Sequence, residues 1–187
     1  VLKYRMPKGD RNIPLSDAYQ ARRTERESAE VWHINKKDVG IMGFSAGGHL
    51  ASSVSTHAEE AVRPNFSILF YPVISMDERI THKGSCVNFL GEERKTNAKL
   101  VEEWSNDKAV RPQVTPRVIL LMSSDDKVVP PVTNGVAYYT AMNKSGNECT
   151  LHIYPSGGHG WGFRNTAQGF RYHVQMLDDL TTWLQHF

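Results

Sequence analysis

Short, continuous runs of hydrophobic residues recur along the chain. Four runs rich in β-branched and aromatic residues predict strands at residues 39–44, 66–73, 117–122 and 149–154. A weaker run predicts another strand at residues 1–6. A strand that is covered on both faces is apolar throughout, whereas a half-exposed strand alternates, so these runs favour a sheet with helices on both faces.

The stretches between the runs have helical periodicity. They predict helices over residues 15–32, 46–58, 132–144 and 166–187. The last one carries an apolar stripe at three- and four-residue spacing, made of Phe170, Val174, Leu177, Leu180 and Leu184. Regular alternation of strand and helix predicts an α/β fold on a mostly parallel sheet, in a single domain over residues 1–187.

One polar stretch, residues 75–116, interrupts this alternation. It contains a predicted helix at 97–104 and is too long for a simple connection. Two interpretations remain open, an insert of ordinary helix and loops, or a cap over a binding pocket.

Composition excludes several functional classes. The 187 residues are 40% hydrophobic and 22% charged, which is typical of a globular domain. The net charge is only +2, and the dense charged run at 22–27 mixes both signs, so no nucleic-acid partner is predicted. The longest apolar run, 66–73, is far shorter than the roughly 20 residues that span a bilayer, so no membrane partner is predicted.

No metal or cofactor is predicted either. Cys86 and Cys149 are too few and too isolated for a disulfide framework or a zinc motif. The chain also lacks a His-Glu-x-x-His pattern, a phosphate-binding glycine loop and a dinucleotide fingerprint.

A Gly-x-Ser-x-Gly pattern lies between a predicted strand and a predicted helix, at residues 43–47. A serine on such a tight turn needs very small neighbours, which Gly43 and Gly47 supply. The turn lifts the Ser45 hydroxyl above the sheet, and the helix that follows aims the Ala46 N–H at a developing oxyanion. Ser45 is therefore the candidate nucleophile and Ala46 a candidate oxyanion donor.

A serine nucleophile needs a base, and His159 is the best placed of the eight histidines. It lies in a glycine-rich loop directly after the last predicted strand, at the strand end where open α/β sheets place their sites. His49, one turn into the helix after Ser45, is a second candidate for lining the pocket, although a structural role is the stronger interpretation.

The base in turn needs a carboxylate that orients it. Asp125 and Asp126 directly follow the strand at 117–122. We favour Asp126, with Asp125 as a turn residue. The chain order Ser45, Asp126, His159 is the order in which α/β-hydrolases present their triad.

With these residues the chain resembles the α/β-hydrolase superfamily, and within it the carbohydrate-esterase and acetylxylan-esterase-like proteins often labelled as relatives of lipases or xylanases. The matching stretches are residues 4–7, 43–51, 70–73, 125–131 and 154–161. The resemblance implies an α/β-hydrolase fold. It also implies that the aspartate four residues before Pro130, which is Asp126, is the triad acid, and that His159 is the base.

One family feature is missing from the sequence. Such esterases carry a His-Gly-Gly segment, upstream of the strand matching residues 1–6, that donates a second oxyanion N–H. In the sheet of this family, the strand that precedes the His-Gly-Gly segment lies between the strands matching 1–6 and 39–44. Because both that strand and the segment are missing from the sequence, we expect an N-terminally incomplete fold with exposed strand edges. The chain is then either the C-terminal portion of a longer protein or is completed by a homo-oligomer or a domain swap.

The resemblance implies ester hydrolysis through an acyl-enzyme, with acetyl or feruloyl groups on plant polysaccharide as the substrate class. Trp161 and Trp104 are candidate stacking surfaces for the sugar, although core or loop packing is the stronger interpretation of each. Two alternatives remain, a serine peptidase of the prolyl-oligopeptidase type and a non-catalytic scaffold. The family is often exported to the periplasm or secreted, but the sequence leaves the compartment unknown.

Overall fold

A computed structural model describes residues 1–164 and 170–186, and its centre is a parallel sheet of four strands. The strands are β1 (Ile41–Phe44), β2 (Phe66–Phe70), β3 (Arg117–Ser123) and β4 (Cys149–Tyr154), which lie side by side in chain order. Their register places Gly43 opposite Leu69, and Leu69 opposite Leu120. The four main strands predicted from the sequence are confirmed, with β1 and β2 shorter than expected.

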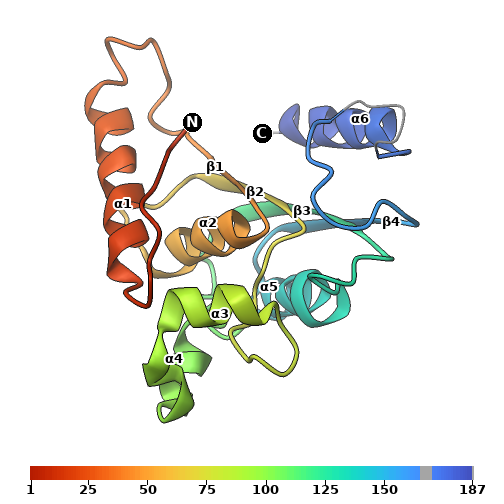
Figure 1. Cartoon of the computed structure of the whole chain (residues 1–187). Helices are drawn as coiled ribbons and strands as arrows, with labels where there is room; N and C mark the ends of the chain where they lie inside the picture. The colour runs from red at the N-terminus through yellow and green to blue at the C-terminus, as the bar shows by residue number, and fades with distance from the viewer. Residues whose placement is uncertain (165–169, 187) are drawn as a thin grey trace.

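Helices cover both faces of this sheet (Figure 1). They are α1 (Asn12–Glu27), α2 (Ala46–His57), α3 (Lys83–Leu90), α4 (Ala98–Glu103), α5 (Ala137–Lys144) and α6 (His173–Leu184), with the single turns η1 (Glu92–Lys95) and η2 (Val132–Val136). In β3, Leu120 packs in one core cluster with Tyr138 of α5. The next residue, Leu121, belongs to the other cluster with Met176 of α6. Successive residues of a strand face opposite sides, so both faces are buried, as predicted.

The N-terminal segment differs from the prediction. Residues 1–6 form no strand, and the Arg5 N–H donates to the Asp17 carboxylate at 2.8 Å instead of to a neighbouring strand. An apolar run adopts strand structure only when another strand pairs with it, and none of the described residues does so here. The prediction of a strand at 1–6 was therefore wrong. The first helix also ends at Glu27 rather than at residue 32.

The last helix shows a different face from the one predicted. α6 begins at His173, and residues 166–169 and 187 of the predicted helix lie outside the described residues. Its buried residues are Met176, Leu180 and Trp183. Three members of the predicted stripe are instead exposed, at 72% for Val174, 37% for Leu177 and 39% for Leu184. The stripe was therefore wrong for these three, although Phe170 and Leu180 are buried.

One edge of the sheet is open. Within the described residues β1 pairs only with β2, and the β1 side chains Met42 and Phe44 are 42% and 37% exposed. A cavity of about 540 Å³ is lined by β1 and, among others, by Val1, Leu2 and Tyr4. No helix in residues 1–164 or 170–186 is both long and apolar enough to cross a membrane.

Candidate active site

Ser45 lies on a strained turn between β1 and α2. Its φ is +52°, a left-handed value that residues other than glycine rarely adopt. The turn is held by the Ser45 N–H, which donates to the Phe70 carbonyl at 3.0 Å, and by the Ser45 carbonyl, which accepts from the Val73 N–H at 3.1 Å. Strain held in this way at a strand end is typical of functional positions.

The neighbours of Ser45 are small because the chain passes close to itself. A β-carbon on Gly43 would stand 2.3 Å from the Gly47 carbonyl oxygen, and one on Gly48 would stand 2.7 Å from Pro72. Gly47 has more room, because a β-carbon there would meet only the Tyr4 hydroxyl, at 3.6 Å. The close packing predicted at Gly43 is thus present. After the serine, the position that has no room for a side chain is Gly48 rather than Gly47.

His159 connects Ser45 to Asp126 through two hydrogen bonds. Its Nε2 lies 2.8 Å from Ser45 Oγ, and its Nδ1 lies 2.7 Å from Asp126 Oδ2. A carboxylate can only accept, so the proton of the neutral imidazole belongs on Nδ1, which leaves Nε2 to accept the Ser45 hydroxyl. The structure brings the three predicted residues together from segments far apart in the chain, in an arrangement that can move a proton off the serine.

The two adjacent aspartates have different surroundings. The Asp126 side chain is completely buried, and its Oδ1 accepts the N–H groups of Val128 and Val129 at 2.9 Å each, which fixes the carboxylate. Asp125 turns the other way, and its Oδ1 accepts the Gly158 N–H at 2.8 Å. That hydrogen bond holds the pKa of the Asp125 carboxyl below its usual value. Asp125 therefore anchors the loop that carries His159.

This loop, residues 155–163, is held at three places. Besides the bond from Gly158 to Asp125, the Trp161 ring N–H donates to Ser123 Oγ at the end of β3, at 2.9 Å. The Tyr71 ring lies against the His159 imidazole, with ring centroids 4.7 Å apart. Four glycines of the loop have positive φ, and their permissive backbone would otherwise leave the imidazole poorly placed. The contacts thus compensate for a flexible sequence.

The oxyanion side is simpler. Ala46 is the first residue of α2, and the first N–H groups of a helix have no partner within the helix. The Ala46 N–H is therefore available beside Ser45. Within the described residues it is the one oxyanion donor that we assign.

The two tryptophans considered as stacking surfaces are buried, in agreement with the packing interpretation. Trp161 is 5% exposed and stacks on Phe170 with centroids 3.9 Å apart. Trp104 is 7% exposed and stacks on His57. The structure places both rings in the interior, so neither presents a face for a sugar to stack on.

His49 is also buried, at 2% exposure, and its Nε2 lies 2.9 Å from the Trp104 carbonyl. Burial lowers the pKa of His49 to about 4, so the ring is neutral at ordinary pH. It nevertheless lines a cavity together with Ala46.

Two exposed aromatic residues beside the site were missed by the sequence analysis. Phe44, directly before Ser45, is 37% exposed, and Phe163, at the end of the His159 loop, is 44% exposed. Their rings meet edge to face, with centroids 6.1 Å apart. Their closeness in sequence to Ser45 and His159 was the available signal, but exposure of a phenylalanine is not readable from a pattern.

No metal site accompanies this arrangement in the part of the chain that the structure describes. There, no three His, Cys, Asp or Glu side chains come together as a group that could hold an ion.

A family model described as the alpha/beta hydrolase fold matches residues 3–163, and the chain belongs to that family. A solved relative, an acetyl ester-xyloside bifunctional hydrolase from Caldicellulosiruptor lactoaceticus, is 32% identical with a TM-score of 0.84. The match covers 98% of this chain and 70% of that one. The fold predicted from the sequence is thereby confirmed.

Two relatives carry enzyme names. An acetylxylan esterase of Xylanibacter ruminicola is 57% identical over 185 residues, which are 99% of this chain and 38% of the relative. An endo-1,4-beta-xylanase B of Butyrivibrio fibrisolvens is 33% identical over 158 residues, which are 79% of this chain and 24% of the relative. The chain therefore spans well under half the length of both relatives.

Proposed function

We propose that this chain carries the catalytic centre of a serine esterase. The observation that supports it best is the continuous hydrogen-bonded path from Ser45 through His159 to Asp126, with distances of 2.8 and 2.7 Å. A nucleophile, a base and a group that orients the base are the parts that acyl transfer needs. All three lie at the carboxyl ends of β1, β3 and β4, where open α/β sheets bind ligands.

The reaction would proceed in two halves. His159 Nε2 takes the hydroxyl proton as Ser45 Oγ attacks the acyl carbon, and the Ala46 N–H stabilises the oxyanion that forms. His159 then gives that proton to the alcohol oxygen as the ester C–O bond breaks. In the second half His159 takes a proton from water, which attacks the acyl-enzyme, and the acid leaves as Ser45 recovers its proton. Asp126 stabilises the imidazolium in both halves.

Acetyl or feruloyl groups on plant polysaccharide are the proposed substrates. The name of the relative that is 57% identical, an acetylxylan esterase, supports an acyl group on xylan. Exposed Phe44 and Phe163 replace the buried tryptophans as candidate surfaces for the sugar. Residues 75–116, which include α3 and α4, are proposed as the cap of this site.

Replacement of the nucleophile tests the proposal. Ser45→Ala should lower kcat for 4-nitrophenyl acetate on the order of 10⁶-fold, because the acyl-enzyme can no longer form. The matched control is Ser16→Ala, an exposed serine on α1, which should leave turnover unchanged. Equal turnover by wild type and Ser45→Ala would refute the proposal. An inactive wild type would favour a scaffold, and preference for a proline amide over the acetyl ester would favour a prolyl-oligopeptidase-like peptidase.

The open edge of β1 is proposed to pair with a strand from a second copy or a swapped segment. Exposed Met42 and Phe44 and the cavity of about 540 Å³ beside them support this pairing, because unpaired edges invite strand addition.

A further inference from the structure

A second cavity, of about 310 Å³, is lined by Ala46, the residue that directly follows Ser45. Its walls come from the N-terminal stretch, the first turn of α1, the start of α2, and α3 with the residue before it. They include Tyr4, Pro7, Ala46, Leu50, Asn88 and Phe89. The N-terminal stretch and α3 are joined by the Gly9 N–H, which donates to the Asn88 carbonyl at 2.7 Å, so the two walls are held together.

The position of this cavity relates it to the reacting carbonyl. Ala46, which lines it, directly follows Ser45 and supplies the oxyanion N–H that we assign. An ester whose carbonyl oxygen points at that N–H therefore has one of its two substituents near the mouth of the cavity. The polarity of the walls decides which substituent enters.

The walls are apolar and carry no formal charge. Of the described residues that line the cavity, none is Asp, Glu, Lys or Arg. His49 is neutral because burial lowers its pKa to about 4, and its ring packs edge-on against Phe89. A sugar with several hydroxyl groups would lose hydrogen bonds to water in such surroundings without replacing them. The acyl group of the ester is thus the substituent that suits the cavity.

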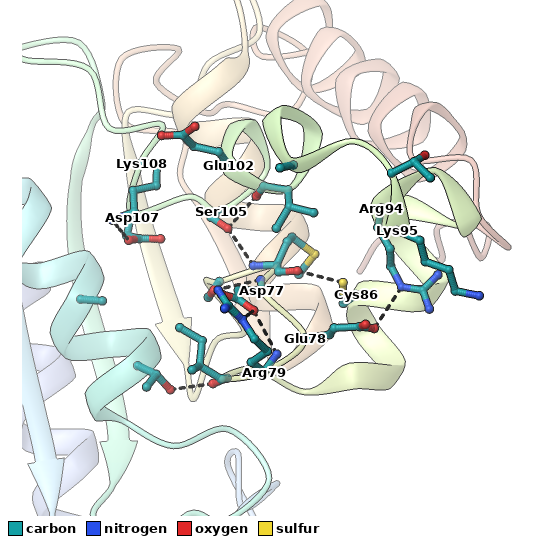
Figure 2. A pocket seen from close by; sticks show the side chains of 18 residues that line it. Asp77, Glu78, Arg79, Cys86, Arg94, Lys95, Glu102, Ser105, Asp107 and Lys108 are labelled. Atoms are coloured by element: carbon teal, nitrogen blue, oxygen red, sulfur yellow. Dashed lines mark hydrogen bonds and ion pairs between the residues drawn. The ribbon is translucent and has the colours of Figure 1, made fainter.

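A cavity of about 780 Å³ provides a contrast (Figure 2). It lies between the loop after β2 and helices α3 and α4, and Figure 2 shows its charged lining, with Arg79 beside Asp77 and Arg94 beside Glu78. Ala46, which lines the apolar cavity, does not line this one. Its paired charges, and the absence of Ala46 from its lining, make it less suited to an acyl group than the apolar cavity.

The size of the apolar cavity indicates the kind of acyl group. Pockets that enclose a drug-sized molecule begin at roughly 300 Å³, which is close to the volume of this cavity. An acetyl group, which adds only one methyl to the carbonyl, would leave most of it empty. At the cavity wall, the Tyr4 hydroxyl and the Asn88 amide make no hydrogen bond to another side chain among the described residues. They are available to a phenolic or methoxy oxygen on an otherwise apolar ring.

We propose that this cavity binds an aromatic acyl group of the hydroxycinnamoyl class, with α3 as the element that sets acyl preference. The inference rests on the proposed esterase function. Of the two acyl groups proposed above, acetyl and feruloyl, it favours feruloyl, because that group is large enough to fill the cavity. Acetyl esters would react without using most of the cavity.

Filling the cavity tests the proposal. Asn88→Trp places a large ring in it, and Lys83→Trp places the same ring on an exposed position of α3 that does not line it. The measurement is kcat/KM for 4-nitrophenyl ferulate and 4-nitrophenyl acetate, which share a leaving group. The ferulate-to-acetate ratio should fall about tenfold or more in Asn88→Trp, and should stay at the wild-type value in Lys83→Trp. An unchanged ratio in Asn88→Trp would overturn the proposal.

A binding measurement separates this proposal from the esterase function. Ferulate should bind to the Ser45→Ala variant in a titration. Adding Asn88→Trp to this variant should weaken that binding about tenfold. Acetate should not compete with ferulate. Absence of ferulate binding overturns the cavity assignment, even if acetate esters are hydrolysed. Circular dichroism checks the fold, and Asn88→Leu, a smaller change, should give an intermediate loss.

Discussion

The two sides of Ser45 are built differently. On one side, the loop that carries His159 is fixed by Asp125, by Ser123 and by the Tyr71 ring, and Asp126 is buried beneath it. On the other side, Ala46 lines one cavity, its neighbour Gly47 lines another, and the edge of β1 is open among the described residues. The base and acid are therefore preorganised by this chain's own contacts, whereas the oxyanion side has room for a substrate and for another strand.

The largest effect on turnover is expected at Asp126, on the preorganised side of Ser45. Asp126→Asn should lower kcat by about 10⁴-fold, because an amide no longer selects the tautomer with the proton on Nδ1. The matched variant is Asp125→Asn, because Asp125 only anchors the loop, and this variant should lose about tenfold or less. Steady-state kinetics on 4-nitrophenyl acetate compares the two. Equal losses would mean that the adjacent aspartates are not distinguished as the structure places them.

A smaller effect concerns His49, on the side of the apolar cavity. Its folded pKa of about 4 lies below the ordinary 6.5, so the folded protein keeps it neutral while the unfolded chain binds a proton. Stability should therefore fall as pH drops from about 6.5 towards 4, by about 2 kcal/mol between pH 7 and pH 5 from this residue. Urea denaturation at both pH values measures it. The pH-dependent part should shrink in His49→Gln and persist in His33→Gln, at an exposed position.

The contacts of the loop around His159 should each have a modest effect. Trp161→Phe keeps a ring on Phe170 but removes the N–H that donates to Ser123, a hydrogen bond with a net value of about 1 kcal/mol. We expect kcat to fall roughly fivefold, with little change in KM, because the imidazole and not the substrate is displaced. Trp32→Phe, on an exposed tryptophan, is the control. A rise in KM alone would show that Trp161 contacts substrate.

The smallest effect on turnover is expected at the open edge. Met42→Lys places a charge on exposed β1 and should shift a paired species towards monomer in sedimentation, with less than about a twofold change in kcat for the acetate ester. A wild-type protein that is monomeric at all concentrations would contradict pairing between copies at this edge.

The sheet and the positions of the candidate catalytic residues were predictable because both depend on local patterns. Runs such as Val118 to Met122 are apolar since both faces are covered, and Ser45, Asp126 and His159 each follow a strand. Their distances, 2.8 and 2.7 Å, required the structure.

Other features depend on contacts between distant segments, and the sequence was a poor guide to them. Residues 1–6 have strand-like composition, but no described strand pairs with them. In α6 two apolar faces compete, and Met176 is buried while Val174 is exposed. The sequence favoured packing for Trp161 but could not name its partner, which is Phe170, a residue nine positions further along the chain.

Active-site labelling tests the central claim most directly. A fluorophosphonate probe reacts with a serine whose hydroxyl is activated by a neighbouring base, and mass spectrometry of the digested protein locates the adduct. We expect a single adduct on Ser45, lost in His159→Ala and retained in His49→Gln. An intact Ser45 peptide in folded wild-type protein, or labelling that persists in His159→Ala, would contradict the assignment of Ser45 as a nucleophile activated by His159.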